Sequence, residues 1–112
     1  MNMSEPVSFK DFKKLDFRVS TVKKVEQVPG SDKLYRMQVD IGDKTIQIVT
    51  GLIEYYEPEE LQDKRIIVCT NLAPAKIFGQ LSEGMLLAAE TPEGDLALLT
   101  TDKDIKNGAK IT

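Results

Sequence analysis

Two lysines, Lys33 and Lys76, stand where a cation on a surface loop could hold an anionic ligand. Lys33 follows a turn predicted over residues 29–32, and Lys76 lies in the long connection between two apolar stretches. An ammonium group in either place can neutralise one phosphate and release its counterions, so that affinity falls with salt. The ordinary alternative is a solvated lysine on a surface loop, and residue type alone does not separate the two.

Four more side chains could complete such a site. The Asn71 amide donates and accepts, which suits a ribose 2′-hydroxyl or a base edge, although asparagine is also a common turn residue. Ser82 offers a hydroxyl to phosphate or sugar beside Gly84, a residue that permits close backbone approach. Met85 could contact a ribose or base, or it could open an apolar strand as a core residue. Alternation along its strand places Arg36 on the solvent or groove side.

The composition argues against catalysis and against a metal site. The sequence has no histidine, which removes the commonest general base and the commonest metal ligand. Its single cysteine, Cys69, lies in the apolar run of residues 66–70 and is expected to be an inert core residue. No P-loop, dinucleotide-binding glycine pattern or pair of carboxylates is recognisable. We therefore expect a non-catalytic protein that needs no cofactor.

Charge is distributed unevenly along the chain. The net charge is -3, which argues mildly against a nucleic-acid partner. Residues 64–81 nevertheless carry Lys64, Arg65 and Lys76 without an acid, whereas the acids gather in residues 50–63. A local basic region is consistent with an anionic ligand, and an ordinary mixed surface explains the same pattern.

Targeting signals are not evident. No apolar run approaches the ~20 residues that a membrane helix needs. The first residues show neither the basic patch nor the apolar region of a signal peptide. These observations predict a cytoplasmic protein without a membrane partner.

Hydrophobic periodicity and turn residues predict the elements that would position these side chains. The first half is predicted to contain a helix over residues 8–15, a strand over 16–28 with a bulge near 20–22, and strands around 35–39 and 46–48. The second half is predicted to contain a short helix near 58–61, strands over 65–70, 84–90 and 96–100, and a final edge segment. The connection over 71–83 is expected to be a loop. Three antiparallel strands, a helical connection and two more strands are the arrangement of an OB-fold barrel.

The predicted fold class is therefore all-β: one domain over residues 1–112, built as a five-stranded OB-fold barrel. Short helices stand at its N-terminus and between strands three and four. A β extension over residues 96–112 lies outside the five predicted barrel strands. Apolar segments outside a closed core often serve self-association, so the extension predicts a homodimer interface.

Five short motifs together resemble the tRNA-binding domain family. They are residues 15–19 (LDFRV), 31–35 (SDKLY), 48–52 (IVTGL), 71–76 (NLAPAK) and 82–89 (SEGMLLAA). The resemblance extends from about residue 9 to the last residue. The family includes free-standing tRNA-binding proteins, the C-terminal domain of many methionyl-tRNA synthetases, and a separate synthetase β subunit in some archaea.

The resemblance implies a dimeric OB-fold that binds tRNA by shape and backbone, on the outer corner of the molecule. Such a module would assist methionyl-tRNA synthetase in trans and would not be catalytic by itself. Two positions depart from the family pattern: Ser20 stands where glycine is usual, and Val28 stands where histidine is usual before Pro29. Both departures bear on local backbone geometry more than on contacts.

Two other functions remain open at this point. A dimeric peptide-binding export chaperone resembles the same fold, and a structural adaptor could use the terminal segments instead of the groove. Of the three tyrosines, Tyr35 is expected in the core, while Tyr55 and Tyr56 fall in the acidic connection. Few tyrosines are therefore free to stack on bases, which favours recognition of folded RNA through its backbone.

Overall fold

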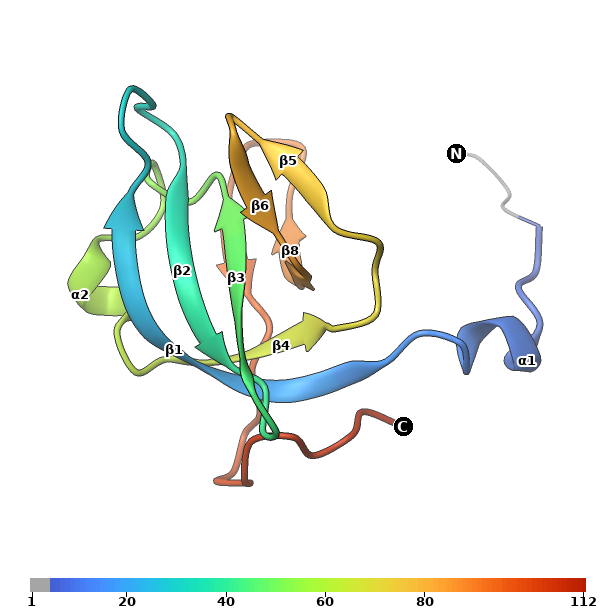
Figure 1. Ribbon diagram of the computed structural model, residues 1–112. Coiled ribbons are helices and arrows are strands. Elements are labelled where there is room, and N and C mark those ends of the chain that lie inside the picture. Colours follow the sequence, from blue (N-terminus) through green and yellow to red (C-terminus); the bar gives the residue numbers. More distant parts are fainter. Residues whose placement is uncertain (1–4) are drawn as a thin grey trace.

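The computed structural model describes residues 5–112 and is built around one long, coiled strand, β1 (Figure 1). The prediction that no signal peptide is present rests partly on residues 1–4, which lie outside this range. The helices are α1 (Phe9–Phe12) and α2 (Pro58–Leu61). The strands are β1 (Phe17–Gln27), β2 (Tyr35–Asp40), β3 (Thr45–Thr50), β4 (Arg65–Cys69), β5 (Ala75–Ile77), β6 (Gln80–Ser82), β7 (Met85–Leu86), β8 (Ala88–Glu90) and β9 (Leu96–Leu98).

Five strands form the main antiparallel sheet in the order β3-β2-β1-β4-β7. The sheet curls until β3 meets the segment that precedes β7. There the Glu83 N–H donates to the Gln47 carbonyl at 2.8 Å, and the Gln47 N–H donates to the Glu83 carboxylate at 3.0 Å. These bonds nearly close the barrel and confirm the predicted five-stranded OB-fold.

Gly84 occupies the point of closest approach in this closure. A Cβ there would lie 2.9 Å from the Cys69 carbonyl oxygen and 2.9 Å from Ile46 Cδ1. A side chain would therefore force the Gly84 backbone away from the Cys69 carbonyl of β4, because a contact this short is strongly repulsive. The structure thus assigns Gly84 a packing role within the barrel, and approach of a ligand to this glycine remains a prediction.

Alternating apolar residues from the sheet fill the barrel. Members of the core that are less than 5% exposed include Val22, Met37, Val39, Ile46, Ile48, Leu61, Ile66 and Val68. Cys69 is buried beside them, as predicted. Tyr35 is also buried, and its hydroxyl donates to the Tyr56 carbonyl at 2.8 Å. Desolvation raises the pKa of this tyrosine, so it stays neutral and polar within an apolar setting.

A register shift in β1 lies between Val22 and Lys24, next to the bulge predicted near residues 20–22. On one side of the shift β1 pairs with β4, and beyond it the strand continues along β2 alone. Ser20, the residue that replaces the usual glycine, is fully buried, and its hydroxyl donates to the Arg18 carbonyl at 3.2 Å. The serine is thus accommodated without an unpaired hydroxyl.

Three predicted boundaries are wrong. The helix predicted over 8–15 is shorter, Phe9–Phe12, although the Ser8 hydroxyl caps it by accepting from the Asp11 N–H at 3.1 Å. The connection predicted as a loop over 71–83 contains the β5–β6 hairpin. The strand predicted over 84–90 divides into β7 and β8, because β8 leaves the main sheet to pair with β9.

The C-terminal extension is integrated into the barrel. Leu98 of β9 is buried in the core cluster. Further on, residues 108–111 run along β1: the Gly108 N–H donates to the Val19 carbonyl at 2.8 Å, and the Ile111 N–H donates to the Phe17 carbonyl at 2.9 Å. The expectation that the extension lies outside the barrel is therefore wrong for these segments.

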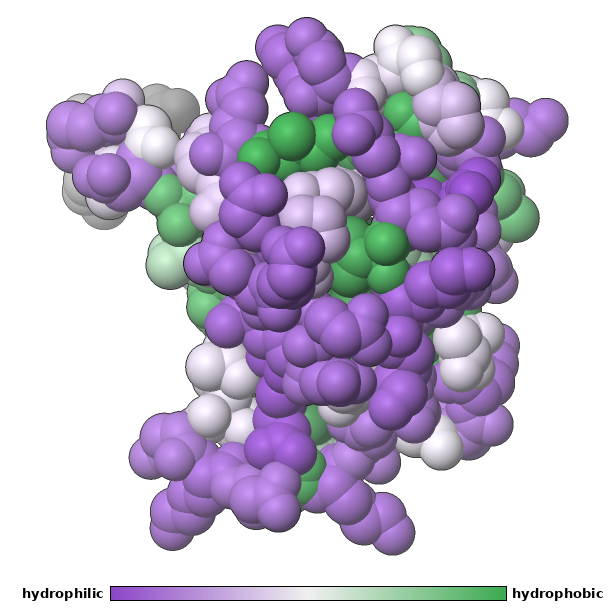
Figure 2. All heavy atoms as spheres, turned by 90° about the vertical axis from the view of Figure 1, so that its left-hand side faces the viewer, coloured by the Kyte–Doolittle hydropathy of each residue, from purple (hydrophilic) through white to green (hydrophobic). Residues whose placement is uncertain are grey.

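The face over β1 and α2 is covered mainly by hydrophilic side chains, with apolar atoms visible in small separate areas (Figure 2). Across residues 5–112, neither helix is long or apolar enough to span a membrane. An apolar groove lies on another side of the barrel, against β3 and the β5–β6 hairpin.

Candidate functional site

A groove of about 210 Å³ opens between β3, the segment leading into β5, and β7. Its lining is mostly apolar and comprises Ile48, Val49, Thr50, Leu72, Ala73, Ala75, Ile77, Ser82, Gly84, Met85 and Leu86. The lining residues cover much of the 71–85 stretch from which sequence analysis took four of its candidates. Ser82 and Met85 line the groove, whereas Asn71 and Lys76 do not.

The β5–β6 hairpin forms one wall of this groove and is held against the barrel by polar bonds. Gln80 accepts a hydrogen bond from the Arg36 guanidinium at 2.8 Å, and the Gln47 side chain donates to the Leu81 carbonyl at 2.7 Å. Two neighbouring strands of the sheet, β2 and β3, therefore fix the hairpin along its length. Its tip lies at the same end of the barrel as the β1–β2 loop (Figure 1).

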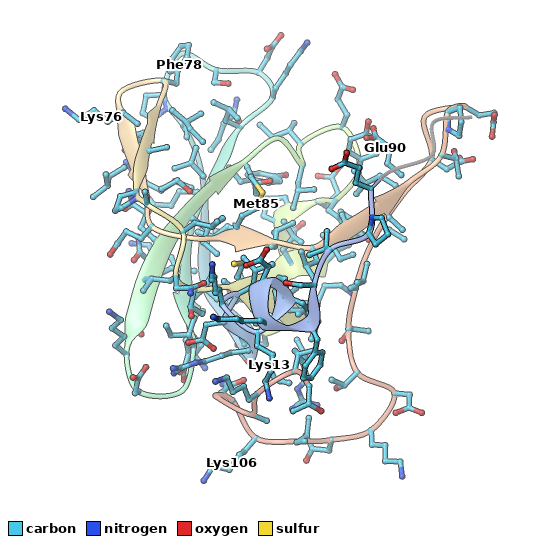
Figure 3. All side chains as sticks on the ribbon, turned by 90° about the vertical axis from the view of Figure 1, so that its right-hand side faces the viewer. Lys13, Lys76, Phe78, Met85, Glu90 and Lys106 are labelled. Carbon is cyan, nitrogen blue, oxygen red and sulfur yellow. The ribbon has the colours of Figure 1, made fainter. Side chains whose placement is uncertain are left out.

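Lys33 and Lys76 lie at this same end. Lys76 projects from β5 near the hairpin tip, far from Lys106 (Figure 3). Lys33 lies in the β1–β2 loop. Its carbonyl accepts a hydrogen bond from the Ile53 N–H at 3.3 Å, which places the Lys33 backbone beside the segment that follows β3. Both lysines are exposed, and within the described range neither has a carboxylate within 4.0 Å, although the exposed Asp32 shares the loop of Lys33.

Arg36 occupies a different electrostatic setting. Besides its bond to Gln80, its guanidinium forms an ion pair with Glu26 at 3.1 Å. Lys24 and then Arg36 hold the pKa of the Glu26 carboxyl below its ordinary value, since both donate to it. The Arg36 charge is thus already compensated, and the side chain orders the hairpin wall.

Asn71 links the N-terminal helix to the barrel. Its amide oxygen accepts from the Asp16 N–H at 2.9 Å, and its amide nitrogen donates to the Lys14 carbonyl at 2.6 Å. Both polar atoms of the side chain therefore have backbone partners more than 50 residues away in sequence. In this structure the residue positions the chain between α1 and β1.

Ser82 is 6% exposed, and its hydroxyl is already engaged. It accepts from the Val49 N–H and donates to the Gly84 carbonyl, both at 3.1 Å. The side chain fixes the hairpin base to β3 and leaves no free hydroxyl for a ligand. Met85 differs, because it is 58% exposed and lines the groove; Figure 3 shows it apart from Lys76 and Phe78. Of the two interpretations of this methionine, the structure favours the groove wall over the core.

Phe78 is a candidate that sequence analysis missed. It occupies the turn of the β5–β6 hairpin, is 60% exposed, and lies close to Lys76 (Figure 3). The argument against base stacking rested on the tyrosines, and this phenylalanine fell in a segment expected to be a loop. Gly79 was the available signal for a turn.

The chemistry available at the groove is that of a binding site. Over the described residues, no group of three or more cysteine or acidic side chains could hold a metal ion. The groove itself offers apolar contact. Two exposed lysines and one exposed aromatic ring lie outside its lining, on the β5–β6 hairpin and the β1–β2 loop at one end of the barrel. These features suit a ligand that carries both negative charge and flat or apolar surface.

Comparison with known proteins agrees with this description. A family model described as "Putative tRNA binding domain" matches residues 17–110. Methionine–tRNA ligase of Methanocaldococcus jannaschii is 50% identical over 107 residues, which are 96% of this chain and 16% of the ligase. The ligase of Pyrococcus horikoshii is 49% identical over 96% of this chain and 15% of its own length. The chain thus spans about one sixth of these relatives.

Solved structures show the same fold. A crystal structure of a MetRS-related protein from Pyrococcus horikoshii superposes with a TM-score of 0.91 at 36% identity, covering 97% of this chain and 100% of that one. The chaperone CsaA from Bacillus anthracis superposes with a TM-score of 0.86 at 30% identity, covering 96% of this chain and 100% of CsaA.

Proposed function

The chain belongs to the tRNA-binding domain family, and from that premise we propose that it is a non-catalytic module that binds tRNA through the shape and backbone of the folded RNA. The observation that carries the proposal is the pair of exposed lysines, Lys33 and Lys76, at one end of the barrel, neither of which has a carboxylate within 4.0 Å among residues 5–112. Phosphates are the natural partners of such cations. Met85 supplies apolar contact in the groove, while Arg36, Asn71 and Ser82 hold the surrounding backbone in place.

This proposal predicts a defined response to salt. Each phosphate contact is expected to add roughly 0.7–0.9 to the slope of log Kd against the logarithm of the salt concentration. Two contacts therefore give a slope of about 1.4–1.8. Filter binding of bulk tRNA across a series of salt concentrations measures this slope directly. Absence of binding at low salt, or a salt-independent affinity, would contradict the proposal.

We further propose that the chain acts as a homodimer in the cytoplasm and presents tRNA to methionyl-tRNA synthetase in trans. Two grooves in one assembly would raise the apparent affinity through avidity, which offsets the unfavourable net charge of -3. Sedimentation equilibrium measures the dimer. Co-purification of the synthetase from the source organism tests the partnership, and a chain that stays monomeric and recovers no synthetase would refute this extension.

A second candidate function, peptide binding by a chaperone-like module, is favoured by the apolar groove lining and by the similarity to CsaA. Peptide binding would depend on apolar side chains in the ligand and would persist at high salt. Competition between tRNA and an apolar peptide separates the two functions. If the peptide binds at high salt and displaces tRNA, the groove serves peptides as well.

A further inference from the structure

Phe78 has an unusual backbone and an unusual exposure. Its φ is 52°, in the left-handed region that bulky side chains rarely occupy, and it is 60% exposed. Glycine or asparagine would fit this turn with less strain, and neither would leave an apolar ring in water. Strained, exposed residues of this kind persist at functional sites because the surrounding structure holds them there.

The ring is supported from the neighbouring loop. A Cβ built on Gly30 would lie 3.5 Å from Phe78 Cε2, so the ring packs against a part of the β1–β2 loop that has no side chain. The Arg36–Gln80 bond, next to the turn, fixes the hairpin from β2. The aromatic ring is therefore presented on a supported edge while most of its surface stays open.

Two exposed lysines stand near the ring in sequence. Lys76 precedes it by two residues on β5, and Lys33 follows Gly30 by three residues in the supporting loop, with the exposed Asp32 beside it. An exposed aromatic ring with lysines on its own hairpin and on the supporting loop matches a nucleotide, which has a flat base and a charged phosphate. A basic peptide would be repelled by the same lysines, and a purely apolar ligand would leave them unused.

We propose that Phe78 stacks on an unpaired base of the bound RNA while Lys33 and Lys76 contact the phosphates beside it. The inference rests on the proposed tRNA-binding function and adds a base-contacting residue to it. Base–aromatic stacking tolerates every base because each has a π-face, so the contact adds affinity without strong sequence preference. This proposal revises the expectation that the protein recognises tRNA only through the RNA backbone.

A tryptophan at this position reports the contact directly. The sequence contains no tryptophan, so Phe78→Trp introduces a single tryptophan, which can be excited selectively over the three tyrosines. Stacking on a base is expected to quench its emission when tRNA is added, whereas heparin, a polyanion without bases, should not. Phe9→Trp is the matched control, because Phe9 is 71% exposed and lies on α1. Binding of Phe78→Trp to tRNA without quenching would overturn the stacking proposal and leave the proposed function intact.

Phe78→Gly tests the same contact without a reporter. Glycine suits the positive φ, so the melting temperature is expected not to fall, while tRNA affinity drops by about 5- to 150-fold, the range for loss of one stacked base. Unchanged affinity in Phe78→Gly would refute stacking. Absence of tRNA binding by the unaltered chain would refute the proposed function and this inference with it.

Discussion

Reversing the charge of Lys33 and Lys76 together, as Lys33→Glu/Lys76→Glu, is expected to weaken tRNA binding by roughly 10²-fold near 0.1 M salt. Each phosphate contact contributes about 5- to 8-fold at that salt concentration, and the introduced carboxylates add repulsion. Both lysines are exposed and unpaired in the described range, so the substitutions break no ion pair. Filter binding at several salt concentrations measures both the affinity and the slope.

Lys103→Glu/Lys106→Glu is the matched control for this variant. Both lysines are exposed, and Lys106 lies at the opposite end of the molecule from Lys76 (Figure 3). The control changes the net charge by the same amount, so any effect of total charge appears in both variants. Equal losses in the two variants would show that the RNA responds to overall charge rather than to the end of the barrel that carries Lys33 and Lys76.

Gly42→Ala is expected to destabilise the fold by about 2–5 kcal/mol, because a positive φ and a steric overlap act together. Gly42 has a φ of 110°, and a Cβ there would lie 2.5 Å from Gly108 Cα. The alanine must therefore displace the C-terminal segment that pairs with β1 at Val19. Urea denaturation followed by circular dichroism measures the free energy of unfolding, and hydrogen exchange of the Gly108 amide reports release of the segment.

Gly94→Ala separates the two causes. Gly94 has a φ of 95° but has nothing within 4 Å of its Cβ position, so alanine there incurs the backbone strain alone. It should lower the free energy of unfolding by about 1–2 kcal/mol. If Gly42→Ala proves no less stable than Gly94→Ala, the close packing of Gly108 on the β2–β3 turn contributes nothing to the fold.

The integration of residues 108–111 also changes how self-association should be tested. Deleting residues 96–112 would remove the buried Leu98 and the bonds to β1, so a monomeric truncation could reflect a damaged barrel. Sedimentation of the intact chain avoids this ambiguity. The proposed homodimer remains a prediction for that measurement.

Much of the barrel follows from the sequence because its strands repeat every two residues. Met37 and Val39 of β2 and Ile46 and Ile48 of β3 point to the core in strict alternation, and the turn residues between them mark the hairpin. The β5–β6 hairpin escaped prediction because its six strand residues are largely exposed and have no clear alternation. Its position depends on bonds to β2 and β3, more than 30 residues away.

The candidate site divides in the same way. Exposed lysines could be predicted from their place after a turn and in a connection. The roles of Asn71 and Ser82 could not, because their partners, Asp16 and Val49, come from distant elements. Phe78 was hidden for a related reason, since the glycine that supports its ring lies 48 residues earlier in another loop. Hydrogen bonds between distant elements decide which polar groups remain free to bind a ligand. The local sequence does not indicate these bonds.

The central claim is that tRNA covers the end of the barrel that carries Lys33 and Lys76. Acetylation of exposed lysines, followed by mass spectrometry with and without bound tRNA, tests this most directly on the unaltered chain. We predict that tRNA protects Lys33 and Lys76 while Lys103 and Lys106 react at the same rate in both samples. Protection confined to Lys103 and Lys106, with Lys33 and Lys76 still reactive, would contradict the account.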